Sequence, residues 1–310
     1  MFNLKCPLVN QNICETKNTG VEFAINTRNI ETKDFKWNST VTFTYNKEKI
    51  LSLIDGTSDN ISNGNTGYSL SKGHPVNSFY HYKLDGVWQL GEEKDAAVFG
   101  AKPGDLKINI PGMEREAEGK YYKVNDNGEK TYYDSTNKYT PSNKDYQVLG
   151  HNAPDWTMGF QNTFTYKNFD LSVFMYMRWG QMIKYNMLGR YDPSGVRNFP
   201  EYFNYWTETN PSNDFPAIYA NRSLTNYVGS AALSYVDGSF FKIKNITLGY
   251  TLPTNWLQKA GIGKCRFYAT ITNPLVVAKS HLLKDYDPEM NGSLDYPLTK
   301  QMVFGVNLSF

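Results

Sequence analysis

A two-residue alternation of apolar and polar side chains recurs along the chain and continues up to its last residue. In the closing stretch QMVFGVNLSF, residues 301–310, every second side chain from Met302 to Phe310 is apolar. Successive side chains of a β-strand point to opposite faces of the sheet, so this stretch predicts a strand with one apolar and one mostly polar face. A strand at a chain terminus stays ordered where neighbouring strands hold it. Its apolar face contacts either a protein core or lipid, and three further features of the sequence distinguish these cases.

Six other segments show the same alternation. On the apolar phase of all seven segments only Ser39 and Asn162 are polar, and no residue is charged. A β-sandwich also shows alternation, with its apolar face turned inward. The segments span residues 21–25, 35–45, 156–166, 169–179, 246–252, 265–271 and 302–310.

The first distinguishing feature is that the connections between these segments are alternately short and long. In an up-and-down meander this order places every short turn at one end and every long loop at the other, as in outer-membrane barrels. The strand-like stretch 77–89 is assigned to the first long loop, because one more crossing would move the turn at 167–168 to the long-loop end. The short connections are 29–34, 167–168 and 253–263, and the long loops, expected to be extracellular, are 46–154, 181–239 and 274–300.

The positions of the aromatic rings and the strand lengths are the other two features, and both favour lipid. Rings of the apolar phase lie near strand ends, where barrels carry aromatic girdles. Most segments have the about 9 to 11 residues that a tilted strand needs to cross a bilayer. The predicted fold class is therefore all-β: an antiparallel transmembrane β-barrel, present here as an incomplete C-terminal section of about seven membrane strands with long extracellular loops. An open sheet leaves two unpaired edges in lipid, so the chain is not expected to stand alone.

Charge and composition exclude other classes. Lys and Arg total 32 and Asp and Glu total 30, and this formal net charge of +2 gives no electrostatic reason to expect nucleic acid. No apolar run approaches the ~18 residues of a membrane-spanning helix. The opening MFNLKCPLVNQ is not a signal peptide, so the chain is expected to be cytoplasmic or a piece of a longer protein.

The three cysteines give no firm framework of disulfides. Cys6 and Cys14 either pair or remain free, and Cys265 is expected to act as a small hydrophobic residue.

Five stretches, in order, resemble the C-terminal barrel region of the SusC/RagA family of TonB-dependent outer-membrane transporters. The resemblance spans nearly all of the chain from about residue 18 onward. The stretches are residues 18–50, residues 153–181, YVDGSFFKIKNITLGYTLP (235–253), DYDPE (285–289) and YPLTKQMVFGVNLSF (296–310).

This resemblance implies a plugged barrel of about 22 strands, energised through TonB and working with a SusD-like surface lipoprotein. The expected function is nutrient uptake in the bacterial cell outer membrane, importing oligosaccharides or peptides, with no catalysis and no cofactor. Residues 1–310 are expected to be part of one barrel domain, without the plug and N-terminal domains, so that TonB is reached through a region upstream. Outer-membrane lipid and the barrel-assembly machinery are further expected partners.

Aromatic side chains on the long-loop side are the candidate substrate-binding residues. Rings with polar neighbours offer a flat apolar surface for a sugar or a peptide. In the alternative interpretation they pack the loops against one another or against a partner protein. The candidates are Tyr202, Tyr205, Trp206, Tyr219, Trp88 and Tyr235.

Asp285, Asp287 and Glu289 place three carboxylates at alternate positions in the last long loop, the kind of oxygen ligand that a hard cation such as calcium takes. The alternative, which we adopt, is an acidic loop braced against neighbouring basic residues, with no metal. The family often carries a calcium-like acidic loop after a PGD stretch; here Pro103, Gly104 and Asp105 remain, without regular acidic spacing after them.

Phe310 resembles the terminal aromatic residue by which outer-membrane barrels are recognised for assembly, and it also completes an aromatic girdle. No metal-ligand, nucleophile or nucleotide motif accompanies the four histidines, which occur singly. Two other functions stay open from the residues alone: a soluble β-rich glycan-binding module, and a glycan-cleaving enzyme with carboxylates from separate loops.

Overall fold

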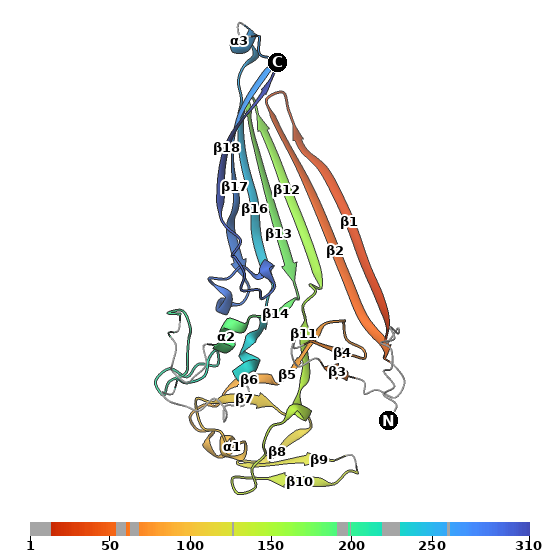
Figure 1. Ribbon diagram of the computed structural model, residues 1–310, viewed down its shortest axis with the longest axis vertical. Coiled ribbons are helices and arrows are strands. Elements are labelled where there is room, and N and C mark those ends of the chain that lie inside the picture. The colour runs from red at the N-terminus through yellow and green to blue at the C-terminus, as the bar shows by residue number, and fades with distance from the viewer. Residues whose placement is uncertain are drawn as a thin grey trace, which may run out of the picture.

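The structure is a computed structural model that describes residues 14–53, 60–62, 68–125, 127–190, 198, 200–218, 230–258 and 261–310. Its main element is one seven-stranded antiparallel sheet in the order β1-β2-β12-β13-β16-β17-β18 (Figure 1). The sheet is open, because β1 and β18 each pair with one neighbour among the described strands. The strands are β1 (Cys14–Glu31), β2 (Phe35–Leu53), β12 (Trp156–Tyr166), β13 (Phe169–Trp179), β16 (Phe240–Thr251), β17 (Lys264–Ala278) and β18 (Gln301–Ser309).

The connections between the strands lie where the alternation of short and long lengths predicts. The short turns and the C-terminus are at one end of the sheet, and the long loops are at the other (Figure 1). The two-residue turn between β12 and β13 places Lys167 at φ 51°, and the third short connection contains α3 (Thr254–Leu257). The stretch 77–89 forms short strands outside the main sheet, as predicted.

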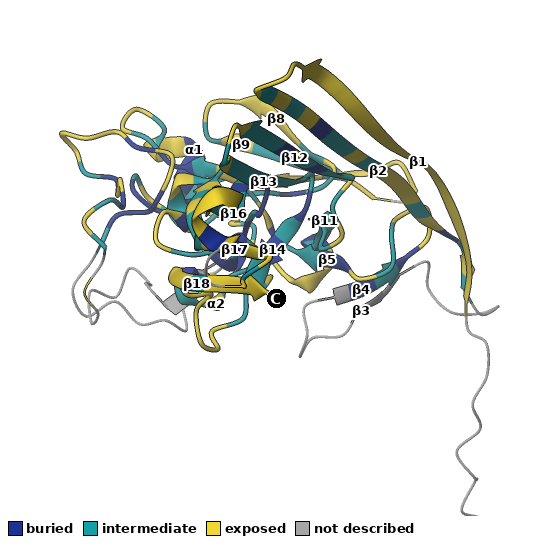
Figure 2. Ribbon diagram, turned by 90° about the horizontal axis from the view of Figure 1, so that it is seen from above, coloured by how far each residue is buried: buried dark blue, intermediate teal, exposed yellow. Residues whose placement is uncertain are grey.

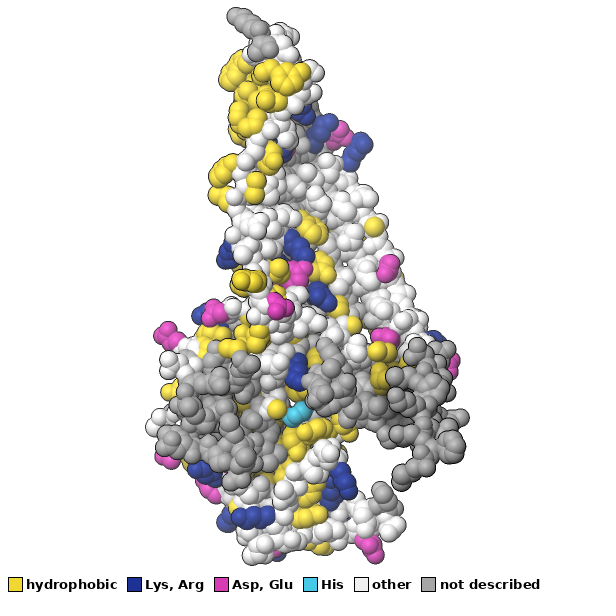
Figure 3. All heavy atoms as spheres, in the orientation of Figure 1, with side chains coloured by type: hydrophobic (Ala, Val, Ile, Leu, Met, Phe, Trp, Pro, Cys, Tyr) yellow, Lys and Arg dark blue, Asp and Glu magenta, His cyan; other side chains and the backbone are white. Residues whose placement is uncertain are grey.

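The apolar face of this sheet is exposed. Phe304 exposes 73% of its surface, and Phe23, Leu248 and Phe267 are also exposed. Hydrophobic side chains gather over the β17–β18 side of the sheet (Figure 3). No second sheet encloses this face within the part of the chain that the structure describes. The sandwich alternative, in which these side chains meet across a dry centre, therefore does not fit.

The opposite face is polar and carries cross-strand pairs. Arg266 on β17 donates two hydrogen bonds to the Asp170 carboxylate on β13 (2.9 and 2.5 Å), across β16. Gly249 of β16 lies between them, where a Cβ atom would overlap both side chains. The absence of a side chain at Gly249 thus makes room for an ion pair that joins three strands.

The long loops fold together into one body with its own core. Val87 and Leu106 come from the first long loop, Ile183 and Phe215 from the second and Leu283 from the third, and all five are buried in one hydrophobic cluster. Figure 2 shows β1 exposed along its whole length at the outer edge of the molecule, while the buried segments gather away from it. We call this part of the molecule the loop body. Its elements are β3 (Asn60–Ser62), β4 (Tyr68–Ser71), β5 (Ser78–His81), β6 (Lys83–Val87), α1 (Glu93–Val98), β7 (Leu106–Asn109), β8 (Met113–Ala117), β9 (Lys120–Val124), β10 (Lys130–Tyr133), η1 (Asn143–Asp145), β11 (Gln147–His151), β14 (Met182–Lys184), α2 (Asn186–Arg190), η3 (Ser230–Ser234), β15 (Tyr235–Asp237), η5 (His281–Leu283) and η6 (Pro288–Met290).

Four strands are longer than the predicted segments, among them β16, which begins at Phe240 and not at Ile246. β1 and β2 pair from Cys14↔Leu53 to Glu31↔Lys36, and β17 continues to Ala278. Residues 46–49 are polar, so the apolar pattern stops while the backbone ladder continues. The first and third long loops accordingly begin later than predicted. Among the described residues, no helix is long and apolar enough to cross a membrane.

Candidate functional site

Two of the predicted ligand-binding rings are buried inside the loop body. Trp88 exposes 3% and Trp206 exposes 5% of its surface. The Trp206 Nε1 donates to Gln89 Oε1 at 2.9 Å, while Trp88 stacks on Phe99 and lies 4.3 Å from Lys107 Nζ. This is the placement expected of residues that pack the loops together, which was the alternative interpretation.

Tyr202 and Tyr205 lie at the edge of the same core. Tyr202 packs edge-on against Phe203 at 5.2 Å, with Lys284 Nζ 5.6 Å from its ring. Tyr205 is 41% exposed, and its carbonyl accepts a hydrogen bond from the Asn210 amide. Tyr219 lies outside the described residues.

Tyr235, the remaining candidate, lines a pocket of about 360 Å³ in the loop body. The pocket forms where strands of the first long loop meet the paired strands β14 and β15 of the second. Its lining combines apolar side chains, two tyrosine rings, an amide and an ammonium group, a composition that suits a small organic ligand. The lining residues are Tyr82, Lys83, Leu84, Gln147, Val148, Leu149, Met182, Ala232 and Tyr235.

An aromatic cluster around His81 adjoins this pocket. The His81 ring stacks on Tyr146 at 4.6 Å and lies 5.4 Å from the rings of both Tyr82 and Tyr235. Burial, with a smaller contribution from the nearby Lys184 charge, lowers the pKa of His81 to about 4. Its buried Nδ1 has no hydrogen-bond partner among the described residues. His81 is thus neutral at physiological pH and packs against Tyr82 and Tyr235, two of the rings that line the pocket.

Tyr82 is buried at the same place. Burial, followed by the neighbouring Tyr146 and Asp145, raises the pKa of Tyr82 to about 12. The Asp145 carboxylate accepts from Tyr139 Oη at 2.6 Å and from Lys123 Nζ at 3.1 Å. These groups are arranged to hold the fold of the first long loop, and none is poised to donate or abstract a proton at neutral pH.

The acidic stretch of the third long loop is braced by two lysines of β16. Lys242 is fully buried, and its Nζ donates to Asp287 Oδ2 at 2.6 Å and to Glu289 Oε2 at 2.7 Å. Lys244 also pairs with Glu289. Asp285 is exposed and takes no part in this network. The predicted bracing of this acidic loop by basic neighbours is therefore present.

The ion pairs also set the charge state of the loop. Burial by itself raises the pKa of Glu289, but the hydrogen bonds from Lys242 and Lys244 outweigh it and hold that pKa below its usual value. Asp287 and Glu289 are thus committed to lysine partners, so they are poor candidates for cation ligands. Across the described ranges, no group of three His, Cys, Asp or Glu side chains has a metal-binding arrangement.

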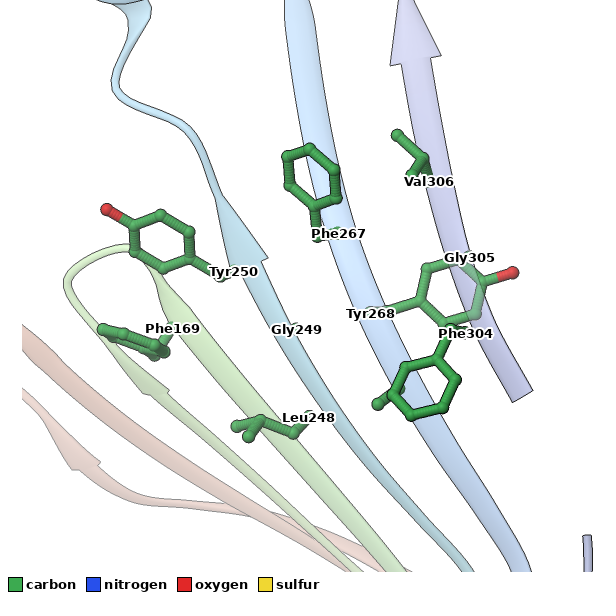
Figure 4. A pocket seen from close by; sticks show the side chains of 10 residues that line it. Phe169, Leu248, Gly249, Tyr250, Phe267, Tyr268, Phe304, Gly305 and Val306 are labelled. Carbon is green, nitrogen blue, oxygen red and sulfur yellow. The ribbon is translucent and has the colours of Figure 1, made fainter. Parts of the chain in front are cut away.

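An apolar groove of about 380 Å³ lies on the main sheet near the short-turn end. Figure 4 shows its side chains from β13, β16, β17 and β18, among them Phe169, Leu248, Phe267 and Phe304. Gly305 makes room for the Tyr268 ring, which lies where a Cβ atom would be. A groove of this composition suits a hydrocarbon chain.

Sequence reasoning missed the two lysines and the His81 cluster. Lys242 and Lys244 alternate with apolar residues in FFKIKN, so the pattern indicates a shared face but gives no partner. Their partners lie more than forty positions away, at Asp287 and Glu289. The cysteines do not contribute to either site. Cys265 is buried, and Cys6, whose pairing with Cys14 was left open, lies outside the described residues.

No protein-family model matches the chain. Among curated proteins, TonB-dependent receptor P3 of Formosa agariphila is 30% identical over 97% of this chain. TonB-dependent receptor SusC of Bacteroides thetaiotaomicron is 28% identical over the same share. The chain spans only 29% and 27%, respectively, of the lengths of these two relatives.

Solved structures give the same result for the fold. A structure of the RagAB peptide transporter matches with a TM-score of 0.72 and 26% sequence identity, covering 97% of this chain and 30% of that one. A structure of the RagAB peptide importer in its closed-closed state matches with a TM-score of 0.68 at the same identity and coverage.

Proposed function

This chain is homologous over nearly its whole length to TonB-dependent receptors of the SusC/RagA type, and we propose that it forms the C-terminal part of the barrel of an outer-membrane nutrient-uptake receptor. In this proposal residues 1–310 belong to one barrel domain, and the plug and the other strands lie in the remaining length of the receptor. Its homologues are receptors and transporters, and we assign no catalytic residue.

The observation that carries the proposal is the exposed apolar face of the seven-stranded sheet. Side chains such as Phe304 and Leu248 are apolar and exposed, so contact with lipid hydrocarbon would remove them from water. The polar opposite face, with Arg266 and Asp170, then lines the inside of the closed barrel. The apolar groove beside Phe304 accommodates an acyl chain of the membrane.

The arrangement of the connections gives the orientation. We assign the loop body, with all three long loops, to the extracellular side and the short turns to the periplasmic side. The loop body then faces a SusD-like surface lipoprotein. The similarity to RagAB and SusC supports a partner of this type. TonB acts through the part of the receptor upstream, and Phe310 at the periplasmic end is the signal for the barrel-assembly machinery.

The cargo is an oligosaccharide or a peptide, and the pocket lined by Tyr235 is the proposed contact in the loop body. Its tyrosine rings offer flat apolar surface, and Lys83 and Gln147 supply polar groups in its lining. Tyr205 is a second candidate, because its ring is exposed; Trp88 and Trp206 support the loops from inside.

The test is an in-frame deletion of the coding region for residues 14–310 in the source organism. We expect loss of growth on one class of glycan or peptide as sole carbon source, and loss of the protein from the outer-membrane fraction. Tyr235→Ala should weaken uptake of the same cargo about tenfold, the effect of losing one stacking contact of about 1.4 kcal/mol. Trp256→Ala, an exposed change in α3 at the opposite end, is the control.

Recovery of the wild-type protein in the soluble fraction, folded and monomeric, would falsify the proposal. Unchanged growth on every glycan and peptide after the deletion counts equally against it.

A further inference from the structure

A second pocket, of about 440 Å³, lies on the polar face of the sheet, away from the pocket lined by Tyr235. The third long loop covers part of the polar face of β16 and β17 and leaves this space beneath it. The lining residues are Lys244, Asn245, Thr272, Asn273, Glu289, Met290 and Leu298.

An irregularity in both strands creates the space. Asn245 pairs with Thr272, and the next pair is Ile243 with Leu275, so Lys244 on one strand and residues 273–274 on the other have no cross-strand partner. Asn273 adopts φ 54°, and the proline that follows it has no N–H to offer the ladder. Bulges of this kind bend the strands locally and redirect side chains, and they are frequent beside functional sites.

The bulge directs three neighbouring side chains of β16 to the polar face. Lys242 lies opposite Tyr176, and Asn245 lies opposite Phe174, which share the polar face of β13. The Lys244 Nζ is 4.7 Å from the Tyr176 ring. Regular alternation would not place both Lys244 and Asn245 on one face.

The pocket is preformed and its charges are balanced. Buried Lys242 holds Asp287 and Glu289, and Lys244 holds Glu289, so two ammonium groups face two carboxylates. A charged ligand would have to separate these pairs, which costs free energy because they are poorly solvated. The balance therefore favours a ligand without net charge.

Two lining side chains have unused hydrogen-bonding capacity. The Asn245 amide and the Thr272 hydroxyl are cross-strand neighbours, and neither has a hydrogen-bond partner among the described residues. Met290 and Leu298 add apolar surface to the lining. A sugar ring matches this combination, because it presents hydroxyl groups at its rim and C–H groups on its faces.

We propose that this pocket binds sugar units of a neutral oligosaccharide as it passes along the inside of the barrel. The inference rests on the proposed function, since the polar face lines the transport path only in a closed barrel. It selects the sugar over the peptide as cargo and adds a site deeper than the loop body. Asn245 and Thr272 donate to and accept from ligand hydroxyl groups, and Lys242 positions the loop that closes the pocket.

The test uses the complete receptor in its own cells. Uptake of labelled maltoheptaose, laminarihexaose, cellohexaose and a tryptic digest of casein is measured in wild-type, deletion and variant strains. The variant Asn245→Leu with Thr272→Val removes the polar groups and keeps the volumes. Asn307→Leu, on the polar face of β18 and outside the pocket, is the matched control. Receptor amounts in the outer membrane are equalised by immunoblotting.

We expect the double variant to lower uptake of the transported sugar about tenfold at subsaturating concentration, the effect of losing about 1.4 kcal/mol of hydrogen bonding. The control should stay within about twofold of wild type, a surface change of under about 0.5 kcal/mol. If deletion abolishes sugar uptake but the double variant matches the control, the pocket is not a sugar site while the uptake function stands. If only the casein digest responds, the cargo class is wrong. If deletion changes none of the probes, the uptake function and this inference fail together.

Discussion

The Ser39 hydroxyl on β2 donates a 2.7 Å hydrogen bond to Asn162 Oδ1 on β12, its direct cross-strand partner. These are the two polar side chains on the apolar phase of the predicted strands, and both are buried. Asn162 Oδ1 also accepts from Trp37 Nε1 at 3.0 Å, and Ser39 Oγ accepts from Asn29 at 2.6 Å. The two exceptions to the apolar pattern therefore satisfy each other.

Replacing Asn162 should show how much this pairing contributes. Asn162→Leu leaves the Trp37 and Ser39 donors without an acceptor, and we expect a loss of about 1–3 kcal/mol of unfolding free energy. Adding Ser39→Ala removes one of the orphaned donors and should restore part of this loss. Urea unfolding of the receptor in lipid vesicles measures both, with Thr163→Val on the opposite face as control. If the loss of unfolding free energy in the double variant equals the sum of the two single losses, the two side chains are not coupled.

The two faces of β18 provide a direct test of lipid contact. Phe304 lies on the apolar face and Val303 lies beside it on the polar face, opposite Thr270. Phe304→Arg should cost about 2–4 kcal/mol near the bilayer midplane and reduce membrane assembly, whereas Val303→Arg points into the polar interior and should cost much less. Heat-modified gel mobility of the outer-membrane fraction reports assembly. If the two variants assemble equally well, the assignment of faces is wrong.

The sequence allowed the main sheet to be predicted because its constraints are local. Alternation gives the face of each residue, and the order of short and long connections gives the topology, so all seven strands were predicted near their positions in the structure. The extension of β1 and β2 beyond Tyr45 was missed, because residues 46–49 are polar while their backbone groups still pair. Hydrogen bonding of the main chain leaves little trace in side-chain composition.

The site was less predictable because its contacts are non-local. Trp88 and Trp206 have the same surroundings in sequence as exposed binding rings. Only their packing distinguishes them, that of Trp206 in the core with Phe215 and that of Trp88 against Phe99. The lysine partners of Asp287 and Glu289 are supplied by a strand that the loop covers. Neither relation follows from spacing along the chain.

His81 should make the loop body sensitive to acid. Its pKa is about 4 in the folded protein and about 6.5 when unfolded, so between these values the unfolded state binds a proton that the folded state does not. Stability of this region should therefore fall as the pH drops from 6.5 to 4. Tyr82, Tyr146, Tyr235 and Lys184 surround the ring, and none of its contacts within the described part of the chain is a carboxylate.

Hydrogen exchange of peptides covering β5 and β11, corrected for the intrinsic effect of pH, measures this response. His81→Phe should remove the part of it between pH 6.5 and 4, while the exposed His74→Phe should leave it unchanged. An identical pH response in the wild type and His81→Phe would exclude His81 as its source.

Lys242 should stabilise the third long loop much more than an exposed lysine does. Lys242→Met leaves Asp287 and Glu289 without their buried cation, and we expect a loss of about 3 kcal/mol in the local opening free energy of residues 281–290. Adding Asp287→Asn should recover part of that loss, because one uncompensated charge is removed. Lys279→Met breaks a half-exposed pair with Asp237 and should cost less than about 1 kcal/mol.

Because the pKa of Glu289 is lowered by its lysine partners, the bracing is present at neutral pH and should weaken as the pH falls below the ordinary 4.5. Proteolysis of the loop in the native receptor measures each effect, and equal cleavage of the two lysine variants would mean that burial of Lys242 adds nothing to the pairing.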